Sequence, residues 1–305
     1  MIDYKKLGFK SGLEIHQQLE GKKLFCSCPT TITRDKADFT VKRYLKASAG
    51  ETGKIDLAAM HEEKKKKYFL YEGYNDFTCL VEIDEEPPHE VNSDALKTTL
   101  QVALLLNCKI VDQIQFMRKT VIDGSNVSGF QRTALVGMNG FIEVDGKKIS
   151  IPSVCLEEEA AQTIERKEEY DTYNLSRLGI PLIEIATGPD ITDAEECREV
   201  AGKIGMILRS VQGMKRGIGT IRQDVNVSIQ NGSRVEIKGF QDYKNIPKAI
   251  DNEILRELEL IKKGEKMEPH VRKVNEDLST TFLRPMPGAA RMYPETDILT
   301  IRPDI

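Results

Sequence analysis

Residues 221–240 read IRQDVNVSIQNGSRVEIKGF and alternate apolar with polar side chains on both sides of a turn sequence. Because side chains in a strand change direction at every residue, this alternation predicts two antiparallel strands with one apolar and one polar face. A three-residue loop at 231–233, with glycine in the left-handed conformation, would place Val227 opposite Ile237 and Ile229 opposite Val235. The stretch therefore predicts a hairpin within an antiparallel sheet.

The polar face of this predicted hairpin carries charges of both signs. In the predicted register Asn226 lies beside Lys238, and the shared face holds Arg222, Asp224, Asn226, Ser228, Arg234, Glu236 and Lys238. Such a face is either the solvent side of a two-sided sheet or a surface that binds a charged ligand. The spacing alone leaves both interpretations open.

Two more strand patterns contain ionisable groups. Residues 180–186, IPLIEIA, form an apolar run typical of a strand buried on both faces, and Glu184 interrupts it. Burial without a partner would either raise the pKa of a carboxylate or require a cation, so Glu184 is a candidate metal ligand or catalytic group. An ion pair with a core arginine is the alternative. Residues 9–19 alternate with period two and place Glu14 and His16 on one face. We expect these side chains to meet Asp224 in one cleft.

Three successive glutamates, 157–159, follow the apolar stretch 149–151. Their mutual repulsion suits Mg2+, which prefers oxygen ligands, while an acidic helix N-terminus is the alternative. Residues 157–171 carry seven acidic and two basic side chains, whereas residues 209–248 carry eight basic and three acidic ones. We expect a metal ion and a phosphate to meet between these two zones.

Another hairpin is predicted over residues 141–151, where the turn Asp145-Gly146 sets Ile142 opposite Ile149. Amphipathic helices are predicted over 93–106 with Ser93 as cap, from the capping box Thr192 to Glu195 onward, and from Pro247 to Gly264.

Strands and single helices follow one another without the regular strand-helix-strand order of a doubly wound sheet. We therefore expect an α+β fold with a largely antiparallel β-sheet and flanking helices. The sequence contains neither a P-loop nor a dinucleotide-binding glycine pattern, so any ATP site must be of another kind.

The composition of the 305 residues, 40% apolar and 30% charged, is typical of a soluble globular protein. A formal net charge of −4 argues against a protein that binds nucleic acid over its whole surface. The sequence shows no membrane-spanning apolar run and no signal peptide, and its six scattered cysteines fit reduced thiols. We expect a cytoplasmic protein without a membrane partner.

Cys26-Ser-Cys28 offers half of a zinc site. A structural zinc ion needs four ligands, usually from two paired clusters, and the sequence has no second Cys-x-x-Cys. On this ground we expect no zinc.

Eight segments occur in one order that resembles the B/E family of tRNA-dependent amidotransferase subunits. They are GLEIHQQL (12–19), KLFCSCP (23–29), DGSNVSGFQRT (123–133), LEEEAA (156–161), GIPLIEIATGPDI (179–191), IRQDVNVSI (221–229), EIKGFQDY (236–243) and PGAARMYPETDI (287–298). The loop at 123–133 and the segment 287–298 resemble the archaeal E type. The Cys-x-x-Cys that completes zinc binding in many B-type proteins is missing, which also favours the E type.

The resemblance implies an ATP- and Mg2+-dependent ligase that converts Glu-tRNA(Gln) to Gln-tRNA(Gln). The γ-phosphoryl group of ATP would activate the glutamyl carboxylate, and ammonia from an asparaginase-like D subunit would then displace phosphate. A hetero-oligomer with that amidase is expected. By the same resemblance the metal ligands are Glu14, His16, Glu157 or Glu158, Glu184 and Asp224, and the groups that order phosphate and substrate are Arg222, Glu236 and Lys238.

The resemblance covers nearly the whole chain, and it implies that residues 1–305 form one catalytic cradle. We expect the synthetase-like insertion, the helical domain and the tail domain of E-type proteins to be absent, and tRNA binding to be weak for that reason. Two alternatives stay open. One alternative is a non-catalytic subunit that positions tRNA or supports assembly. The other is a bacterial B-type subunit of the same reaction.

Overall fold

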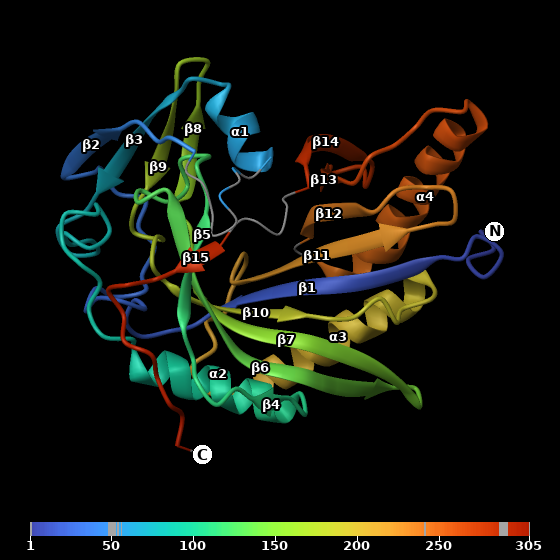
Figure 1. Cartoon of the computed structure of the whole chain (residues 1–305), viewed down its shortest axis with the longest axis horizontal. Helices are drawn as coiled ribbons and strands as arrows, with labels where there is room; N and C mark the ends of the chain where they lie inside the picture. Colours follow the sequence, from blue (N-terminus) through green and yellow to red (C-terminus); the bar gives the residue numbers. More distant parts are fainter. Residues whose placement is uncertain are drawn as a thin grey trace.

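The computed structural model describes residues 2–47, 53, 55, 57–240, 242–286 and 292–304. Figure 1 shows a large curved sheet with helices behind it and a smaller sheet at one end. The predicted α+β class with a largely antiparallel sheet is confirmed. The first part of the segment 287–298, residues 287–291, lies outside the described residues, as does Gln241.

The large sheet has eleven strands in the order β14-β13-β12-β11-β1-β10-β7-β6-β5-β15, with β4 paired to β6. Only β12 and β13, among the strand pairs described for this sheet, run parallel. The bounds are β1 (Lys10–Gln18), β4 (Lys109–Ile110), β5 (Phe116–Thr120), β6 (Phe130–Val144), β7 (Lys147–Glu158), β10 (Pro181–Ala186), β11 (Ile221–Ser228), β12 (Val235–Phe240), β13 (His270–Val274), β14 (Thr280–Pro285) and β15 (Met292–Pro294).

The smaller sheet has the order β2-β3-β9-β8. Its strands are β2 (Phe39–Arg43), β3 (Tyr68–Gly73), β8 (Gln162–Arg166) and β9 (Tyr170–Asn174). The described helices are α1 (Leu57–Glu63), α2 (Ser93–Leu105), α3 (Ala194–Ser210), α4 (Ile246–Lys262) and the 3-10 turn η1 (Tyr243–Asn245). In the part of the chain that is described, no helix is both long and apolar enough to cross a membrane.

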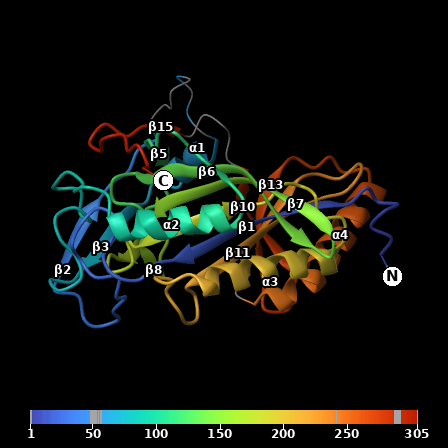
Figure 2. The same ribbon diagram turned by 90° about the horizontal axis from the view of Figure 1, so that it is seen from below.

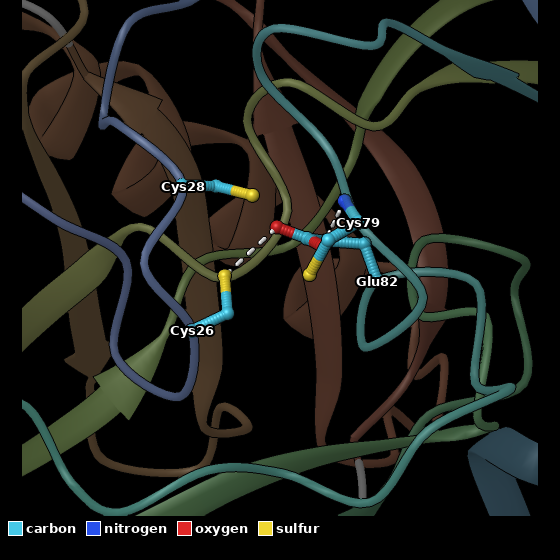
Figure 3. A group of neighbouring side chains, drawn as sticks. All are labelled: Cys26, Cys28, Cys79 and Glu82. Carbon is cyan, nitrogen blue, oxygen red and sulfur yellow. Dashed lines mark hydrogen bonds between the residues drawn. The ribbon is translucent and has the colours of Figure 1, made fainter.

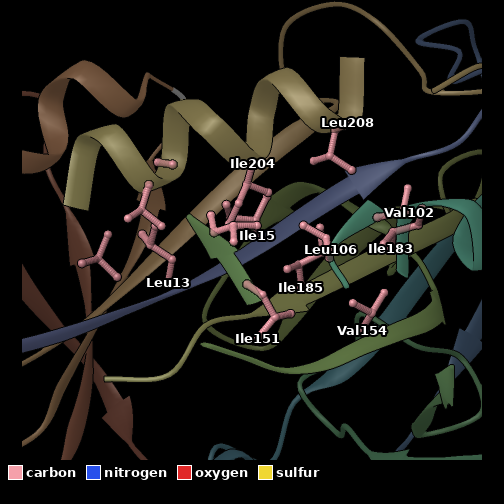
Figure 4. Close-up of a cluster of buried hydrophobic side chains, with 14 of the residues drawn as sticks. Leu13, Ile15, Val102, Leu106, Ile151, Val154, Ile183, Ile185, Ile204 and Leu208 are labelled. Carbon is pink, nitrogen blue, oxygen red and sulfur yellow. The ribbon is translucent and has the colours of Figure 1, made fainter. Parts of the chain in front are cut away.

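The main core lies between the large sheet and helices α2, α3 and α4 (Figures 1 and 2). Strand alternation sends Leu13 and Ile15 of β1, and Ile183 and Ile185 of β10, toward this core (Figure 4). All four are at most 2% exposed. The same alternation turns the polar residues of these strands to the opposite, concave face.

The helices form where they are predicted, with shifted caps. The N-cap of α3 is Asp193, whose side chain accepts a hydrogen bond from the Glu196 amide, one residue after the predicted cap. The N-cap of α2 is Asn92 rather than Ser93, because the Asn92 side chain accepts from two amides of the first turn. The buried face of α2 is formed by Ala95, Thr99, Val102 and Ala103, while Leu104 is 49% exposed.

The hairpin over residues 141–151 has the predicted register, with Ile142 opposite Ile149. Both turn residues, Asp145 and Gly146, have positive φ, as a tight two-residue turn requires. Strand β7 continues to Glu158, so the first two glutamates of 157–159 belong to the strand.

The register predicted for residues 221–240 is wrong by two positions. Val227 pairs with Val235, and Asn226 pairs with Glu236 rather than lying beside Lys238. The connection is longer than predicted because the Ser233 amide donates to Glu257 of α4, which holds the loop away from the strands. A shift of two residues preserves the faces, so the predicted polar face is retained.

Candidate active site

Strand pairing places the candidate ligands of four strands side by side on the concave face. His16 of β1 is opposite Glu184 of β10, and Glu14 of β1 is opposite Asp224 of β11. On the other side of β10, Leu182 is opposite Glu157 of β7. These groups converge although 210 residues separate the first from the last, because β1 and β10 occupy the centre of the sheet.

One ligand cluster consists of His16, Glu157 and Glu184, each with a potential ligand atom within 4.8 Å of the others. His16 Nε2 lies 3.2 Å from Glu184 Oε2. Lys119 of β5 contacts Glu157 and lies 3.8 Å from Glu184. Among the described residues, the ion-pair partners of Glu184 are His16 and Lys119. The alternative, an ion pair between Glu184 and a core arginine, is therefore wrong.

A second ligand cluster consists of Glu14, Asp224 and Glu236, again with ligand atoms within 4.8 Å of one another. Lys238 lies at its edge, with Nζ 2.6 Å from Asp224 and 2.5 Å from Glu236. Burial by itself lowers the pKa of Lys238, but the charges of Asp224 and Glu236 outweigh it and raise that pKa. A lysine therefore lies beside each cluster.

The pKa values of Glu14 and His16 are raised by the neighbouring negative charges. Burial, followed by the charge of Glu184, raises the pKa of the Glu14 carboxyl to about 7. Burial alone would lower the pKa of His16, but the hydrogen bond and charge of Glu184 outweigh it and raise that pKa to about 9. Around Glu14, three carboxylates outnumber the one lysine beside them, and a divalent cation would offset their mutual repulsion.

Both clusters line one cavity of about 580 Å³. Its charged and histidine lining residues are Glu14, His16, Lys119, Asp123, Glu157, Glu159, Arg177, Glu184, Arg222, Asp224, Arg234, Glu236, Lys238 and Arg284.

Of the proposed site residues, Glu158 is the one that does not line this cavity. Its carboxylate accepts a hydrogen bond from the Arg132 amide, 2.9 Å away, on the other side of β7. The geometry thus favours Glu157 where the sequence left Glu157 and Glu158 as alternatives.

A second, basic pocket of about 660 Å³ adjoins the first and shares Arg177 and Arg222 with it. None of the described residues that line it is acidic, and its cations are Arg34, Arg177, Lys215, Arg216 and Arg222. Such a lining fits phosphate oxygens.

Arg222 is held at the boundary of the two pockets by Glu159. Its guanidinium donates to both carboxylate oxygens, at 2.9 and 2.7 Å. Burial tends to raise the pKa of Glu159, but the charges of Arg222 and Arg177 lower it to about 2. Both hydrogen bonds come from Nη2, so Glu159 tethers that end of the guanidinium and leaves its other nitrogens for a ligand.

The sequence pointed to neither Lys119 nor Glu159 as site residues. Lys119 lies in a short strand, Phe116–Thr120, without a clear alternating pattern. Glu159 was visible only as the third member of the acidic run 157–159. Its pairing with Arg222 spans 63 residues and is set by the sheet.

The residues present fit a divalent cation that prefers oxygen ligands. Five carboxylates and one imidazole form the two clusters, and the described lysines beside them supply the compensating charge. Carboxylates are the ligands that Mg2+ uses in phosphate-handling sites.

Cys26 and Cys28 lie apart from this cavity, and they do not stand alone. Cys79 and Glu82 approach them, so that four potential ligands face one another (Figure 3). The expectation of no zinc relied on the absence of a second Cys-x-x-Cys. Cys79-x-x-Glu82 lies where such a second pair would lie, and the expectation of no zinc stays a prediction.

The chain belongs to the family described as the GatB/GatE catalytic domain, which it matches over residues 9–304. It is 53% identical over 279 residues to a protein of Archaeoglobus fulgidus named as the E subunit of glutamyl-tRNA(Gln) amidotransferase, covering 90% of this chain and 45% of that protein. A protein of the same name in Methanococcus maripaludis is 49% identical over 297 residues, covering 95% of this chain and 47% of that protein. The one in Methanocaldococcus jannaschii is 53% identical over 262 residues, covering 86% of this chain and 42% of that protein. The chain spans about half the length of the curated relatives it matches.

Proposed function

We propose that this chain is the catalytic part of a tRNA-dependent amidotransferase that converts Glu-tRNA(Gln) to Gln-tRNA(Gln) at the expense of ATP. Family membership and the names of the archaeal relatives support the class of reaction. The observation that carries the proposal is the cavity itself, in which two three-ligand clusters lie next to an arginine-rich pocket.

The reaction needs two steps, because a carboxylate is a poor acyl donor. An oxygen of the glutamyl carboxylate attacks the γ-phosphorus of ATP, the bond to the β-phosphate oxygen breaks, and ADP leaves. Ammonia then attacks the acyl carbon, the bond to the phosphoryl oxygen breaks, and phosphate leaves as the nitrogen gives up a proton. Negative charge develops in the transition states of both steps, so the catalyst must hold cations in fixed positions near the reacting atoms.

The acidic residues and His16 would bind the metal ion, and the basic residues would bind phosphate. Glu14, Glu236 and Asp224 on one side, and Glu184, Glu157 and His16 on the other, would hold Mg2+. When bound, Mg2+ would neutralise phosphoryl oxygens and orient them for in-line transfer.

The cationic residues serve the phosphates. Lys238 and Lys119 reach the cavity beside the two clusters and place ammonium groups near transferred phosphate. Arg222, fixed by Glu159, faces both pockets and can order a phosphate at their boundary.

The basic pocket supplies a place for the acceptor end of the tRNA. It opens next to the ligand clusters through Arg177 and Arg222, so an esterified glutamate could reach the cavity while the terminal phosphates stay among arginines. Ammonia would come from an asparaginase-like D subunit in a hetero-oligomer, as expected from the resemblance.

The test is a direct assay of the chain with Glu-tRNA(Gln), ATP, Mg2+ and ammonium chloride. ADP formation that depends on both Mg2+ and Glu-tRNA(Gln) is the expected result, with only slow formation of Gln-tRNA(Gln) because tRNA binding is expected to be weak. Binding of tRNA without any ADP formation would overturn the proposal and favour a positioning role. Co-purification with an A-type rather than a D-type amidase would instead identify a B-type protein.

A further inference from the structure

We propose that Ile218, at the tip of the loop between α3 and β11, packs against the face of an unpaired nucleobase at the acceptor end of the tRNA. Ile218 is then a positioning residue, because it would hold that end so that the esterified glutamate reaches the ligand clusters. This role rests on the proposed function, in which the basic pocket receives the acceptor end.

Ile218 combines high exposure with a place in the basic pocket. Among the large apolar side chains of the described residues it is the most exposed, at 96%. A single exposed apolar residue is common on protein surfaces and by itself indicates nothing. Ile218, however, lines the basic pocket together with Ile32 and five cationic side chains. Such a lining suits a ligand that has both an apolar surface and negative charge.

The backbone holds this loop at both ends. The Lys215 amide donates to the Gln18 carbonyl at 2.9 Å, and the Gln18 amide donates to the Thr220 carbonyl at 2.9 Å. Gln18 is the last residue of β1, a central strand of the large sheet. The Thr220 hydroxyl also donates to the Gly217 carbonyl at 2.8 Å and closes the turn from within. The tip of the loop is therefore carried by a fixed frame.

Glycines on both sides of Ile218 allow the sharp turn. Gly217 and Gly219 have φ values of 118° and 83°, a region in which residues with a Cβ are strained. An added Cβ at either position would meet no atom of the described residues within 4 Å. The two glycines thus serve the backbone conformation, and the turn presents an apolar side chain that the fold does not use for packing.

A nucleotide has the two surfaces that this lining suits. Each nucleobase has a flat face that packs on apolar or aromatic side chains, and isoleucine is among the residues that proteins place against bases. Each nucleotide also carries a phosphate. Arg34 and Arg216 are exposed cations of the basic pocket, and they would bind the phosphates next to the base that lies on Ile218.

The adenine of ATP is the other nucleobase in the proposed reaction, and the distribution of cations argues against it. The triphosphate of ATP belongs at the ligand clusters, where Mg2+ would bind it. Arg34, Lys215 and Arg216 line the basic pocket but not the cavity with those clusters. They are therefore placed for additional phosphates, which a nucleic-acid strand supplies at every nucleotide.

The first test compares two RNA hairpins that copy the acceptor stem, one with the unpaired 3′ end and one that stops at the last base pair. Ile218→Ser should weaken binding of the first hairpin by about 5- to 10-fold and leave binding of the second unchanged. Because Ile218 is 96% exposed, the substitution removes no packing, and urea unfolding should match wild type. Equal losses for the two hairpins, or no loss for either, would overturn the inference.

Further variants separate this contact from general electrostatic attraction. Ile218→Ser should leave the salt dependence of binding unchanged, whereas Arg216→Gln should reduce the log–log slope by about one. Ile218→Phe should bind at least as tightly as wild type, because its ring also stacks on a base. Leu299→Ser is the matched control, since Leu299 is 88% exposed and lines neither pocket, and it should bind like wild type. An Ile218→Phe variant as weak as Ile218→Ser would contradict a stacking role.

Steady-state ADP formation distinguishes the two nucleobases. In Ile218→Ser the KM for Glu-tRNA(Gln) should rise by about 5- to 10-fold, while kcat and the KM for ATP stay within about twofold of wild type. A higher KM for ATP with an unchanged KM for Glu-tRNA(Gln) would overturn the inference and assign Ile218 to the adenine of ATP. If wild type forms no ADP, the proposed function fails, and the hairpin comparison still decides whether Ile218 contacts a base.

Discussion

His16 and Glu184 face each other across β1 and β10, with His16 Nε2 3.2 Å from Glu184 Oε2. The contact joins residues 168 positions apart in the chain. It also explains how a carboxylate is accommodated in a strand whose other face is core. Ile183 and Ile185 point into the core, while Glu184 points into the cavity and is 15% exposed.

Glu184→Gln should abolish the Mg2+-dependent ATP hydrolysis of the chain, lowering its rate by about 100-fold or more. The substitution preserves shape but removes the charge that His16 and Lys119 contact. The rate is measured as ADP release in the presence of Glu-tRNA(Gln). Glu143→Gln, on the exposed side of the β6–β7 hairpin, is the control and should retain the wild-type rate. Equal rates in the two variants would show that Glu184 has no part in the reaction.

The pKa of His16 should fall from about 9 toward its ordinary value in Glu184→Gln. The hydrogen bond and charge of Glu184 are what oppose the burial of the imidazole, so their removal favours the neutral ring. At pH 8 the metal-free wild type should hold a protonated His16, and the variant a neutral one. An NMR titration of the imidazole measures both values. A pKa that stays near 9 in the variant would mean that Glu14 and Asp224 alone suffice to hold the proton.

Arg216→Glu should weaken tRNA binding and reduce the salt dependence of the affinity by about one unit of log–log slope. Arg216 is an exposed cation of the basic pocket, and it lies outside the cavity with the ligand clusters. Binding is measured over a salt series. Arg198→Glu, on the exposed side of α3 and outside both pockets, should have a smaller effect. If both substitutions weaken binding equally, the attraction is general and not located in the pocket.

Glu295→Gln should destabilise the chain by about 2 kcal/mol at pH 7, after allowance for solvent screening. Glu295 accepts hydrogen bonds from Arg118 and Arg132, and these tether the strand β15 to the sheet. Burial tends to raise its pKa, but the hydrogen bond from Arg118 and its other donors lower it from 4.5 to about 2. Because the folded-state pKa is lower than the unfolded one, this stability is present above pH 4.5 and is lost as the pH falls toward 2.

Urea denaturation of wild type and Glu295→Gln at pH 7 and at pH 3 checks this dependence. The difference in unfolding free energy should be smaller at the lower pH. Glu85→Gln, which removes a surface ion pair with Arg43, should cost less than about 1 kcal/mol at either pH. A constant difference for Glu295→Gln would show that the charge of Glu295 is not what stabilises the fold.

Gly232→Ala should destabilise the chain by about 1 to 3 kcal/mol, because an added Cβ would lie 2.6 Å from Glu257 and 2.8 Å from Ile229. Gly205→Ala, in the middle of α3, meets only the end of Arg209 at 3.5 Å and should stabilise by about 0.5 to 1 kcal/mol. Thermal or urea unfolding gives both values. Opposite signs are expected. A neutral Gly232→Ala would indicate that the loop before β12 can move away from α4.

The polar face of residues 221–240 shows what a local sequence pattern can predict and what it cannot. Period-two alternation determined that Asp224, Glu236 and Lys238 share a face, and that result holds although the predicted register was wrong by two residues. Faces depend only on whether a shift is even or odd, whereas register depends on what the loop contacts. The loop contact is Glu257 of α4, which no pattern within residues 221–240 could reveal.

The sequence by itself determined the kinds of element, the two faces of each central strand and the family, because these follow from periodicity, turn residues and the order of motifs. The tertiary structure alone decided which strands are neighbours. That arrangement brings Glu14 to Asp224 and His16 to Glu184, chooses Glu157 over Glu158, and joins Cys79 and Glu82 to Cys26 and Cys28. Contacts between distant segments are set by the packing of the sheet against its helices, and the spacing of residues along the chain does not encode that packing in any local form.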